Sequence, residues 1–410
     1  KKPINIPIKE TKMSDPMQGL RGTGEFDTDF RPKNYRELFT LLEPNGSAPF
    51  NALLAMANSE STDDPEYKNF RDEMPERTLK INNSGGYNTT ATALVVDSDA
   101  NTRFVVIGAL LTNLTTGEVM RASANSNPAV LTAITVERNI GGTSHSIADD
   151  ADLAIIGFAA EEGATSPIAV SFDAVVVSNY CQIFRTAFKV TNTLKSTYLR
   201  TGDKEDEVTT KGLRMHMMDI ERAMIWGKKH ETGGTTAQPT RYTGGLLNSI
   251  TTVIDGSAGA PGYVNGVISE DQFDRELIET IFAFGSKQKV AFIGARVASN
   301  LQKIGKQRWS PTQVEGSYGV SMTRYATFAG DLLVHVHPQF RMIPGMENSM
   351  LIVDFPFTRY RYLANRDTQL LRDRQANDED AVKHEYLTEC GLELLQDKVH
   401  AYIKNWSALT

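Results

Sequence analysis

Cysteine, long apolar runs and positive charge are all scarce in this sequence, and each shortage excludes a class of protein. The 410 residues include two cysteines, Cys181 and Cys390, which lie far apart and without the spacing of a metal site. They predict two reduced, buried thiols, as in a cytosolic product, and not a disulfide framework. No apolar run approaches the roughly 18 residues of a membrane-crossing helix, so no membrane partner is expected.

The charge balance argues against a protein that reads nucleic acid. Acidic residues number 50 and basic residues 43, which gives a formal net charge of −7. A free-standing nucleic-acid reader usually carries a basic excess, because contacts with phosphates supply its affinity. Mild acidity suits a surface that lies near DNA without binding it, and it equally suits any soluble protein. The charge therefore excludes one class of function and selects none.

Motifs for enzyme chemistry are also missing. The Gly-rich stretches 232–235 and 256–262 match neither a Walker A loop nor a dinucleotide fingerprint, and they predict surface loops. The sequence contains no nucleophile elbow and no HExxH zinc motif. Carboxylate pairs such as Glu161 and Glu162 fall in predicted turns, which do not indicate a shared catalytic pocket. We therefore expect a protein that is not an enzyme and has no cofactor.

Two histidines come closest to a metal site. His335 and His337 flank Val336 on a predicted strand, so their side chains point to the same face. A zinc site needs further ligands, and no neighbouring cysteine or carboxylate supplies one. His216, on a predicted helix, is expected to be a packing or surface residue. An ordinary alternating strand is favoured over metal binding, and we expect no metal.

The apolar pattern divides the first half of the chain into an arm, a pair of strands and an insertion. Residues 1–50 are irregular and rich in Pro, Gly, Asp and Lys, with one short amphipathic piece at 35–42. Such an arm either becomes ordered on a neighbouring molecule or remains a disordered tail. Residues 65–82 and 168–191 read as strands. Five closely spaced strand patterns between 92 and 158 predict a small barrel or sandwich inserted between them.

Helical patterns follow the insertion. An apolar stripe at positions i, i+4, i+7 and i+11 predicts a long helix over 203–229. The stripe consists of Leu213, Met217, Ile220 and Met224. Ser269 and Gln272 fit a capping box that begins a second helix. Residues 246–340 mix helical and strand patterns, which is typical of an α/β unit.

The last part of the chain is mostly strand-like, over 349–365 and 383–405. Within it, Arg359, Tyr360, Arg361 and Tyr362 alternate basic and aromatic side chains. This alternation resembles a surface for single-stranded nucleic acid. On a strand, however, the arginines share one face and the tyrosines the other, and both residue types are favoured at protein–protein contacts. A protein interface is the preferred interpretation.

Short motifs spread over most of residues 65–405 resemble those of one protein family. They are Tyr-Cys-Gln-Ile-Phe-Arg at 180–185, Asp-Ile-Glu-Arg-Ala-Met-Ile-Trp-Gly at 219–227, Tyr-Thr-Gly-Gly-Leu-Leu at 242–247, Thr-Glu-Cys-Gly-Leu-Glu-Leu at 388–394, Thr-Gly-Glu at 116–118 and Glu-Glu-Gly-Ala at 161–164. In their order and spacing they resemble the major capsid proteins of tailed bacterial viruses, which have the HK97-type fold.

The resemblance implies an α+β architecture of the HK97 type. The N-terminal arm would span 1–64, the extended loop 65–88 and 165–191, and a β-barrel-like insertion domain 89–164. The peripheral domain, with a spine helix at about 203–229, would comprise 192–245 and 341–410. The axial domain would comprise 246–340.

The function that the resemblance implies is assembly. Identical subunits would form hexamers and pentamers and build an icosahedral or prolate head around viral double-stranded DNA, without sequence-specific binding. The protein would reside in the virion after assembly in the host bacterial cytoplasm. Portal, scaffold, decoration or cement proteins are further implied partners. A cellular nanocompartment (encapsulin-like) shell of the same fold is the alternative, and the large β insertion argues against it.

Eight residues are predicted to contact neighbouring subunits. Three lie on the arm, three on the first strand of the extended loop, and two on the Arg-Tyr strand. They are Tyr35, Leu38, Phe39, Phe70, Arg71, Glu73, Arg359 and Arg361.

Overall fold

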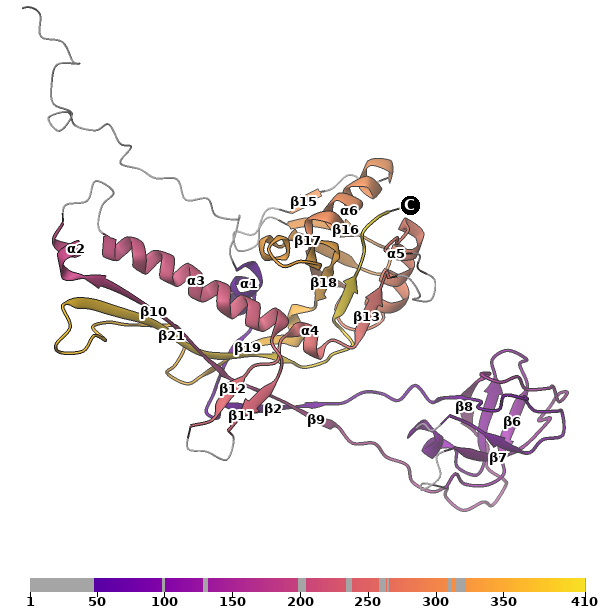
Figure 1. Cartoon of the computed structure of the whole chain (residues 1–410). Coiled ribbons are helices and arrows are strands. Elements are labelled where there is room, and N and C mark those ends of the chain that lie inside the picture. Colours follow the sequence, from indigo (N-terminus) through magenta and orange to yellow (C-terminus); the bar gives the residue numbers. More distant parts are fainter. Residues whose placement is uncertain are drawn as a thin grey trace, which may run out of the picture.

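The computed structural model describes residues 48–97, 100–127, 132–197, 204–233, 238–257, 263, 265–308, 312–314 and 322–409. In this part of the chain a two-lobed body carries a long hairpin, and a small β domain stands at the far end of that hairpin (Figure 1). We call the lobe with the long helix the peripheral lobe and the other the axial lobe. The amphipathic piece predicted at 35–42 lies outside the described residues.

The peripheral lobe is a sheet with one long helix laid across it (Figure 1). Its strands run in the order β1 (Ser59–Thr62), β19 (Thr358–Leu363), β21 (Ala381–Leu394) and β10 (Gln182–Thr191), and β20 (Gln369–Leu371) also pairs with β21. The helix α3 (Lys204–Trp226) packs on β10 and β21, and α1 (Pro49–Ala57) lies against α3 and β19. Short elements complete the lobe: α2 (Asn192–Ser196), α4 (Leu246–Ser249), β11 (His230–Thr232) and β12 (Thr240–Tyr242).

The long helix predicted over 203–229 is confirmed, but its buried face is rotated from the predicted stripe. Ile220 and Met224 are buried as expected, whereas Leu213 and Met217 are only partly buried. Gly212 and His216 take the buried positions two turns and one turn before Ile220. A Cβ atom on Gly212 would lie 3.0 Å from the Phe188 ring of β10, so the glycine allows helix and sheet to approach closely. Glycine and histidine carry no apolar signal, which is why the pattern missed them.

The axial lobe is a mixed sheet. Its strands run in the order β13 (Thr252–Asp255), β22 (Ala401–Lys404), β18 (Met350–Val353), β14 (Gln288–Ile293), β17 (Asp331–Val336), β16 (Met322–Ala326) and β15 (Thr312–Val314). Its helices are α5 (Glu270–Glu276), the π-helix η3 (Leu277–Ile281) and α6 (Ala295–Arg308), and the short 3-10 helices are η5 (Pro338–Arg341), η6 (Met346–Asn348) and η7 (Phe355–Phe357). The capping box predicted at the start of α5 is confirmed, because Ser269 and Gln272 exchange backbone-to-side-chain hydrogen bonds of 2.9 and 3.2 Å.

The strand β14 joins the two lobes through its alternating side chains. Ala291 and Ile293 pack under α5 and α6 in the core of the axial lobe. Val290 and Phe292 point to the opposite face and share a core with Ile220 of α3. Successive residues of a strand point to opposite faces of the sheet, so β14 is buried on both of its faces. The two lobes therefore form a continuous body.

The long hairpin pairs β2 (Glu66–Arg71) with β9 (Val175–Tyr180) in antiparallel register. Beyond it, residues 72–77 and 159–174 run without helix or strand to the small domain. That domain contains β3 (Thr78–Lys80), β4 (Ala93–Val95), the 3-10 helix η2 (Ala100–Phe104), β5 (Ala109–Asn113), β6 (Val119–Ala122), β7 (Ala133–Glu137) and β8 (Asp152–Phe158). The strands predicted between 92 and 158 are confirmed, except that the strand expected from Phe104 begins only at Ala109, and Phe104 ends the 3-10 helix η2.

The inserted sheet closes on itself as a barrel. Its strand order is β3-β8-β5-β6-β7-β4. The two end strands meet through a bridge between Ile81 and Val96, and the Asp97 amide donates to the Lys80 carbonyl at 2.9 Å. Closure removes open sheet edges, which would otherwise invite pairing with another chain. The barrel has its own apolar core, which extends from Leu79 to Leu153 and shares no residue with the cores of the body.

Four expected boundaries are corrected by these pairings. The segment 48–64 was assigned to the arm, yet α1 and β1 are built into the peripheral lobe, where Ser59 pairs with Tyr360. The strand β3 was assigned to the extended loop, yet it pairs with β8 and supplies Leu79 to the barrel core. The strand β10 was also assigned to that loop, yet it pairs along β21. The strands β18 and β22 were assigned to the peripheral domain within 341–410, yet they pair in the sheet of the axial lobe. All four corrections depend on partners far away in the sequence.

Candidate assembly surfaces

The hairpin of β2 and β9 has two chemically different faces. Tyr67, Asn69 and Arg71 alternate along β2 and point toward the body. The Tyr67 hydroxyl donates to the Leu392 carbonyl at 2.9 Å, and the side chains of Asn69 and Arg71 donate to the Leu394 carbonyl at 3.0 and 3.1 Å. These bonds fasten the hairpin to the end of β21.

The opposite face of the hairpin carries an exposed apolar pair at its far end, beyond Lys68. Phe70 pairs directly with Val176 across the two strands, so both side chains lie on this face. Phe70 is 76% exposed and Val176 is 53% exposed. Met74, just beyond β2, is also largely exposed, as is Val175, which pairs with Arg71 and so lies on the other face of the hairpin. Exposed apolar side chains that gather in one place are unusual for a monomer and mark a contact site.

Two charged residues predicted as contacts hold the hairpin to its own chain. Arg71 lies 3.5 Å from the Asp397 carboxylate, and Glu73 forms an ion pair with Lys398. Both partners belong to the turn after β21. The described contacts of Arg71 and Glu73 therefore fix the direction in which the hairpin projects from the body, and their contact with a neighbour stays a prediction.

The predicted alternation of β19 is confirmed. Tyr360 is buried and its ring lies 6.0 Å from that of Tyr362, whereas Arg359 and Arg361 are on the other face. Arg359 and Arg361 reach the Glu60 carboxylate of β1 at 2.5 and 2.9 Å. Although burial would raise the pKa of Glu60, these two guanidinium groups hold that pKa below its ordinary value. The two arginines thus join the edge strand β1 to the sheet.

Arginine–glutamate pairs run along the same face of β21. Glu385, Glu389 and Glu393 lie four residues apart, so their side chains share one face of the strand. They pair with Arg185, Arg366 and Arg361 respectively. The hydrogen bond from Arg185 holds the pKa of Glu385 below its ordinary value. The sequence showed only scattered charges here, because each arginine comes from a different segment.

Three buried histidines connect α3 to its surroundings along its length. His384 of β21 lies 2.9 Å from Glu205 near the start of the helix, and His216 of the helix lies 2.7 Å from the Thr388 hydroxyl. Near the other end, His337 lies 2.8 Å from the Glu221 carboxylate. Burial lowers the pKa of His216, which favours the neutral ring. These histidines position a helix and show no arrangement for catalysis.

Glu221 also holds the start of α1. Its two carboxylate oxygens accept the backbone N–H groups of Phe50 and Asn51 at 2.9 and 2.6 Å. An anion at a helix N-terminus satisfies amides that have no partner within the helix. Glu221 therefore fixes the start of α1 against α3.

The predicted pair of histidines forms no metal site in the described structure. His335 and His337 both place their rings near Phe292, with centroids 6.2 and 5.7 Å apart. Among the described residues, no cluster of three His, Cys, Asp or Glu side chains could hold a metal ion. The described helices also include none long and apolar enough to cross a membrane. Cys181 and Cys390 are buried free thiols, and burial raises the pKa of Cys181 to about 12.

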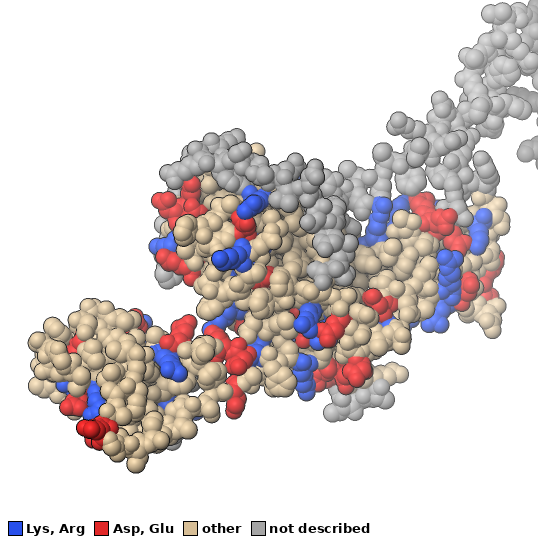
Figure 2. Space-filling view, turned by 180° about the vertical axis from the view of Figure 1, so that it is seen from behind, with Lys and Arg blue, Asp and Glu red and all other residues tan. Residues whose placement is uncertain are grey.

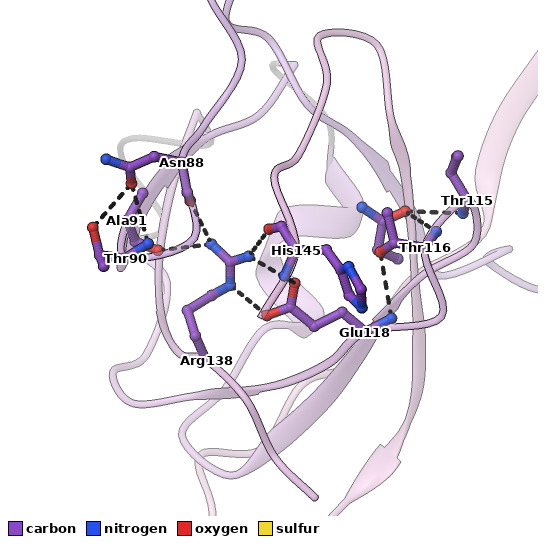
Figure 3. A network of polar contacts seen from close by, with 9 residues as sticks. Asn88, Thr90, Ala91, Thr115, Thr116, Glu118, Arg138 and His145 are labelled. Carbon is purple, nitrogen blue, oxygen red and sulfur yellow. Dashed lines mark hydrogen bonds and ion pairs between the residues drawn. The ribbon is translucent and has the colours of Figure 1, made fainter. Parts of the chain in front are cut away.

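A buried ion pair ties the loops at one end of the inserted barrel together (Figure 3). Arg138 donates two hydrogen bonds of 2.7 Å to the Glu118 carboxylate, and both side chains are almost fully buried. The same guanidinium donates to the carbonyls of Asn88, Ala91 and His145. Burial would raise the pKa of Glu118, but Arg138 and the His145 amide keep it below the ordinary value. This network positions loops and leaves no open reactive group.

Charges of both signs are mixed on the face of the body seen in Figure 2. There, Lys and Arg alternate with Asp and Glu over the described residues of the body, and much of the inserted domain carries neither. The described residues on this face form no continuous basic track for nucleic acid. The features that stand out are therefore the apolar hairpin face and the segments that project from the body.

Comparison with known proteins identifies the family. The family model described as SU10 major capsid protein matches residues 22–407. The chain belongs to the SU10 major capsid protein family. A curated relative, the major capsid protein of Pseudomonas phage PaMx41, is 28% identical over 374 residues, which cover 87% of this chain and 86% of the relative. The resemblance predicted from the sequence is confirmed: this is a phage major capsid protein, with the α+β, HK97-type arrangement of spine helix, extended loop and two lobes.

Three solved structures are weakly similar to this chain. A Mycobacterium phage Bobi structure gives a TM-score of 0.43 at 8% identity and covers 92% of this capsid protein and 96% of that chain. The capsid of a native GTA particle gives 0.42 at 8% identity, with 93% and 97% covered. The holo-SrpI encapsulin complex from Synechococcus elongatus PCC 7942 gives 0.38 at 15% identity, with 57% and 78% covered.

The predicted contact residues are thus distributed over different environments. Tyr35, Leu38 and Phe39 lie outside the described residues. Phe70 is strongly exposed, whereas Arg71, Glu73, Arg359 and Arg361 have ion-pair partners within the chain. Val175 and Val176 were not among the contacts predicted from the sequence. A run of valines predicts a buried strand, so only the structure could show that these two are exposed.

Proposed function

We propose that this capsid protein works by self-association and that its role is structural, without enzymatic activity. Identical copies form hexamers and pentamers, which build an icosahedral or prolate head around double-stranded DNA without sequence-specific binding. The head is assembled in the host bacterial cytoplasm and becomes the virion shell. Portal, scaffold and decoration or cement proteins are the other partners in this scheme.

The observation that carries the proposal is the exposed apolar face of the hairpin. Phe70 and Val176 leave water only if another molecule covers them, because the hairpin projects from its own body (Figure 1). Burying one such side chain contributes about 1.5–3 kcal/mol, so the two contribute about 3–6 kcal/mol per contact before the cost of association. Summed over many subunits, contacts of this size support a stable closed shell.

The ion pairs of Arg71 and Glu73 support the same function in a different way. Ordering a free hairpin on binding would cost conformational entropy, which weakens a contact. Here the hairpin is already tied to β21 and to the turn at Asp397 and Lys398. The apolar face is therefore presented to a neighbour in a fixed direction.

The test is assembly of the purified protein with and without Phe70→Asp. Negative-stain electron microscopy and sedimentation should show closed particles for the unaltered protein and soluble subunits or capsomers for the variant. Leu114→Asp is the matched control, since Leu114 is 61% exposed but lies in a turn of the inserted barrel. The control should still assemble. Particle yield that is the same for Phe70→Asp and the unaltered protein would contradict the role of the hairpin.

A second measurement separates a virus shell from a nanocompartment of the same fold. Particles recovered from infected cells should contain double-stranded DNA that is protected from nuclease. Particles that hold a protein cargo and no DNA would support the nanocompartment instead.

A further inference from the structure

Two exposed phenylalanines mark the end of the axial sheet where β14 and β17 begin. Phe328, at the tip of the turn between β16 and β17, is 101% exposed. Phe284, in the turn that precedes β14, is 46% exposed. We call the two turns, 282–286 and 327–330, the axial turns. Neither phenylalanine was among the contacts predicted from the sequence.

The axial turns pack directly against each other. The Asp331 amide donates to the Lys287 carbonyl at 2.7 Å, at the point where Gln288 of β14 pairs with Asp331 of β17. A Cβ atom on Gly330 would lie 2.5 Å from the same Lys287 carbonyl and 2.7 Å from the Phe282 ring. Only glycine fits in this gap, so the two phenylalanine-bearing turns are held side by side.

Both turns are fixed by hydrogen bonds. Thr327 bonds to Gly330 through its amide and its hydroxyl, at 2.9 and 2.7 Å to the carbonyl oxygen. The Asp354 carboxylate accepts the Ser286 amide at 2.7 Å and the Ser286 hydroxyl at 2.6 Å. A mobile surface loop lacks such a set of bonds. The structure therefore displays both rings from a rigid base.

A buried lysine connects this base to the foot of the hairpin. The Lys289 ammonium group donates to the carbonyls of Ile281, Phe284 and Val399 at 2.7, 2.8 and 2.7 Å. Val399 follows Lys398, which forms the ion pair with Glu73 beyond β2. The axial turns and the foot of the hairpin are thus joined through one segment, 395–399. The starts of β14 and β22 lie at the same end of the axial sheet, because both strands run antiparallel to β18.

We propose that Phe284 and Phe328 form a second contact with a neighbouring copy of this chain, in addition to the contact made by the hairpin. The proposal rests on the shell function proposed above. A ring of identical subunits needs contacts between two different surfaces of each copy. Two exposed aromatic rings on rigid turns, anchored to the same segment 395–399 as the foot of the hairpin, meet that need. The body is also hollowed between the axial lobe and the inserted domain (Figure 2), which leaves room for a neighbour.

Photo-crosslinking from position 328 tests the proposal. Phe328 is replaced by the phenylalanine analogue p-benzoylphenylalanine, and equal amounts of ¹⁴N- and ¹⁵N-labelled subunits are assembled and illuminated. Mass spectrometry should find crosslinked peptide pairs of mixed isotope, which arise only between copies. The same analogue at Leu114 is the control position and should give fewer mixed pairs. In parallel, Phe328→Ser should raise the concentration needed for assembly by about tenfold or more, as expected for one lost apolar contact.

The possible results separate this inference from the proposed function. Particles whose crosslinks from position 328 stay within single copies, or do not form, would overturn the inference and leave the shell function standing. The same holds if Phe328→Ser assembles at the concentration of the unaltered protein. Failure of the unaltered protein to form any particle would overturn both.

Discussion

Replacing Arg138 with methionine should unfold the inserted barrel before the rest of the chain. The substitution removes both hydrogen bonds to Glu118 and leaves its carboxylate buried, with the His145 amide still donating at 2.9 Å. Breaking a buried ion pair in this way costs about 3–5 kcal/mol. A barrel of roughly 80 residues is expected to have a stability of about 4–12 kcal/mol. The loss is therefore a large part of the total, and it falls on one domain because the barrel core is separate from the cores of the body.

Calorimetry combined with hydrogen exchange measures this effect. The variant should show an earlier transition, with lost protection confined to residues 78–158. Arg121→Met is the control, because Arg121 pairs with exposed Glu137 and Glu161 and should contribute less than about 1 kcal/mol. The double change Glu118→Leu with Arg138→Met should be milder than Arg138→Met alone, since no charge stays buried.

The same pair gives the barrel a defined response to acid. Because the folded state lowers the pKa of Glu118 below 4.5, its contribution to stability is complete above that value and is lost as pH falls through the folded pKa. Acid sensitivity of the barrel should therefore decrease in the double variant. If Arg138→Met destabilised the barrel no more than Arg121→Met does, the reasoning from burial would be refuted.

Two further predictions concern the body of the protein. Glu221→Gln should destabilise the attachment of α1 by about 1.5–3 kcal/mol, which is the value of a hydrogen bond to a charged group. Faster proteolysis at residues 48–58 should reveal the loss, and an unchanged cleavage rate would contradict the role of Glu221. Lowering the pH below 6.5 should reduce the urea concentration at which half of the body is unfolded. Burial lowers the pKa of His216 and brings the pKa of His400 to about 3. The unfolded chain therefore takes up protons that the folded chain does not, and acid favours unfolding. His400→Asn should make the fall of the urea midpoint with pH shallower. The same pH dependence in the variant and the unaltered protein would argue against the role of His400.

Local patterns in the sequence determined the elements whose signal is contained in a few neighbouring residues. The helix α3 follows from apolar residues at helical spacing, and the start of α5 follows from Ser269 and Gln272. The separate faces of β19 follow from strict alternation of arginine and tyrosine. Periodicity and capping act within one or two turns of chain, so these features needed no knowledge of the fold. The order of the short motifs along the chain likewise indicated the capsid family.

Only the tertiary structure decided what covers each strand. The segment at β3 joins the barrel because β8, some 70 residues later, supplies its partner, and α1 belongs to the body because Glu221 binds its first amides. Val176 and Phe328 have the composition of core residues yet face water. Burial depends on which distant segment packs against a side chain, and no local pattern specifies that segment. The apolar surfaces proposed to hold the shell together could therefore be located only in the folded chain.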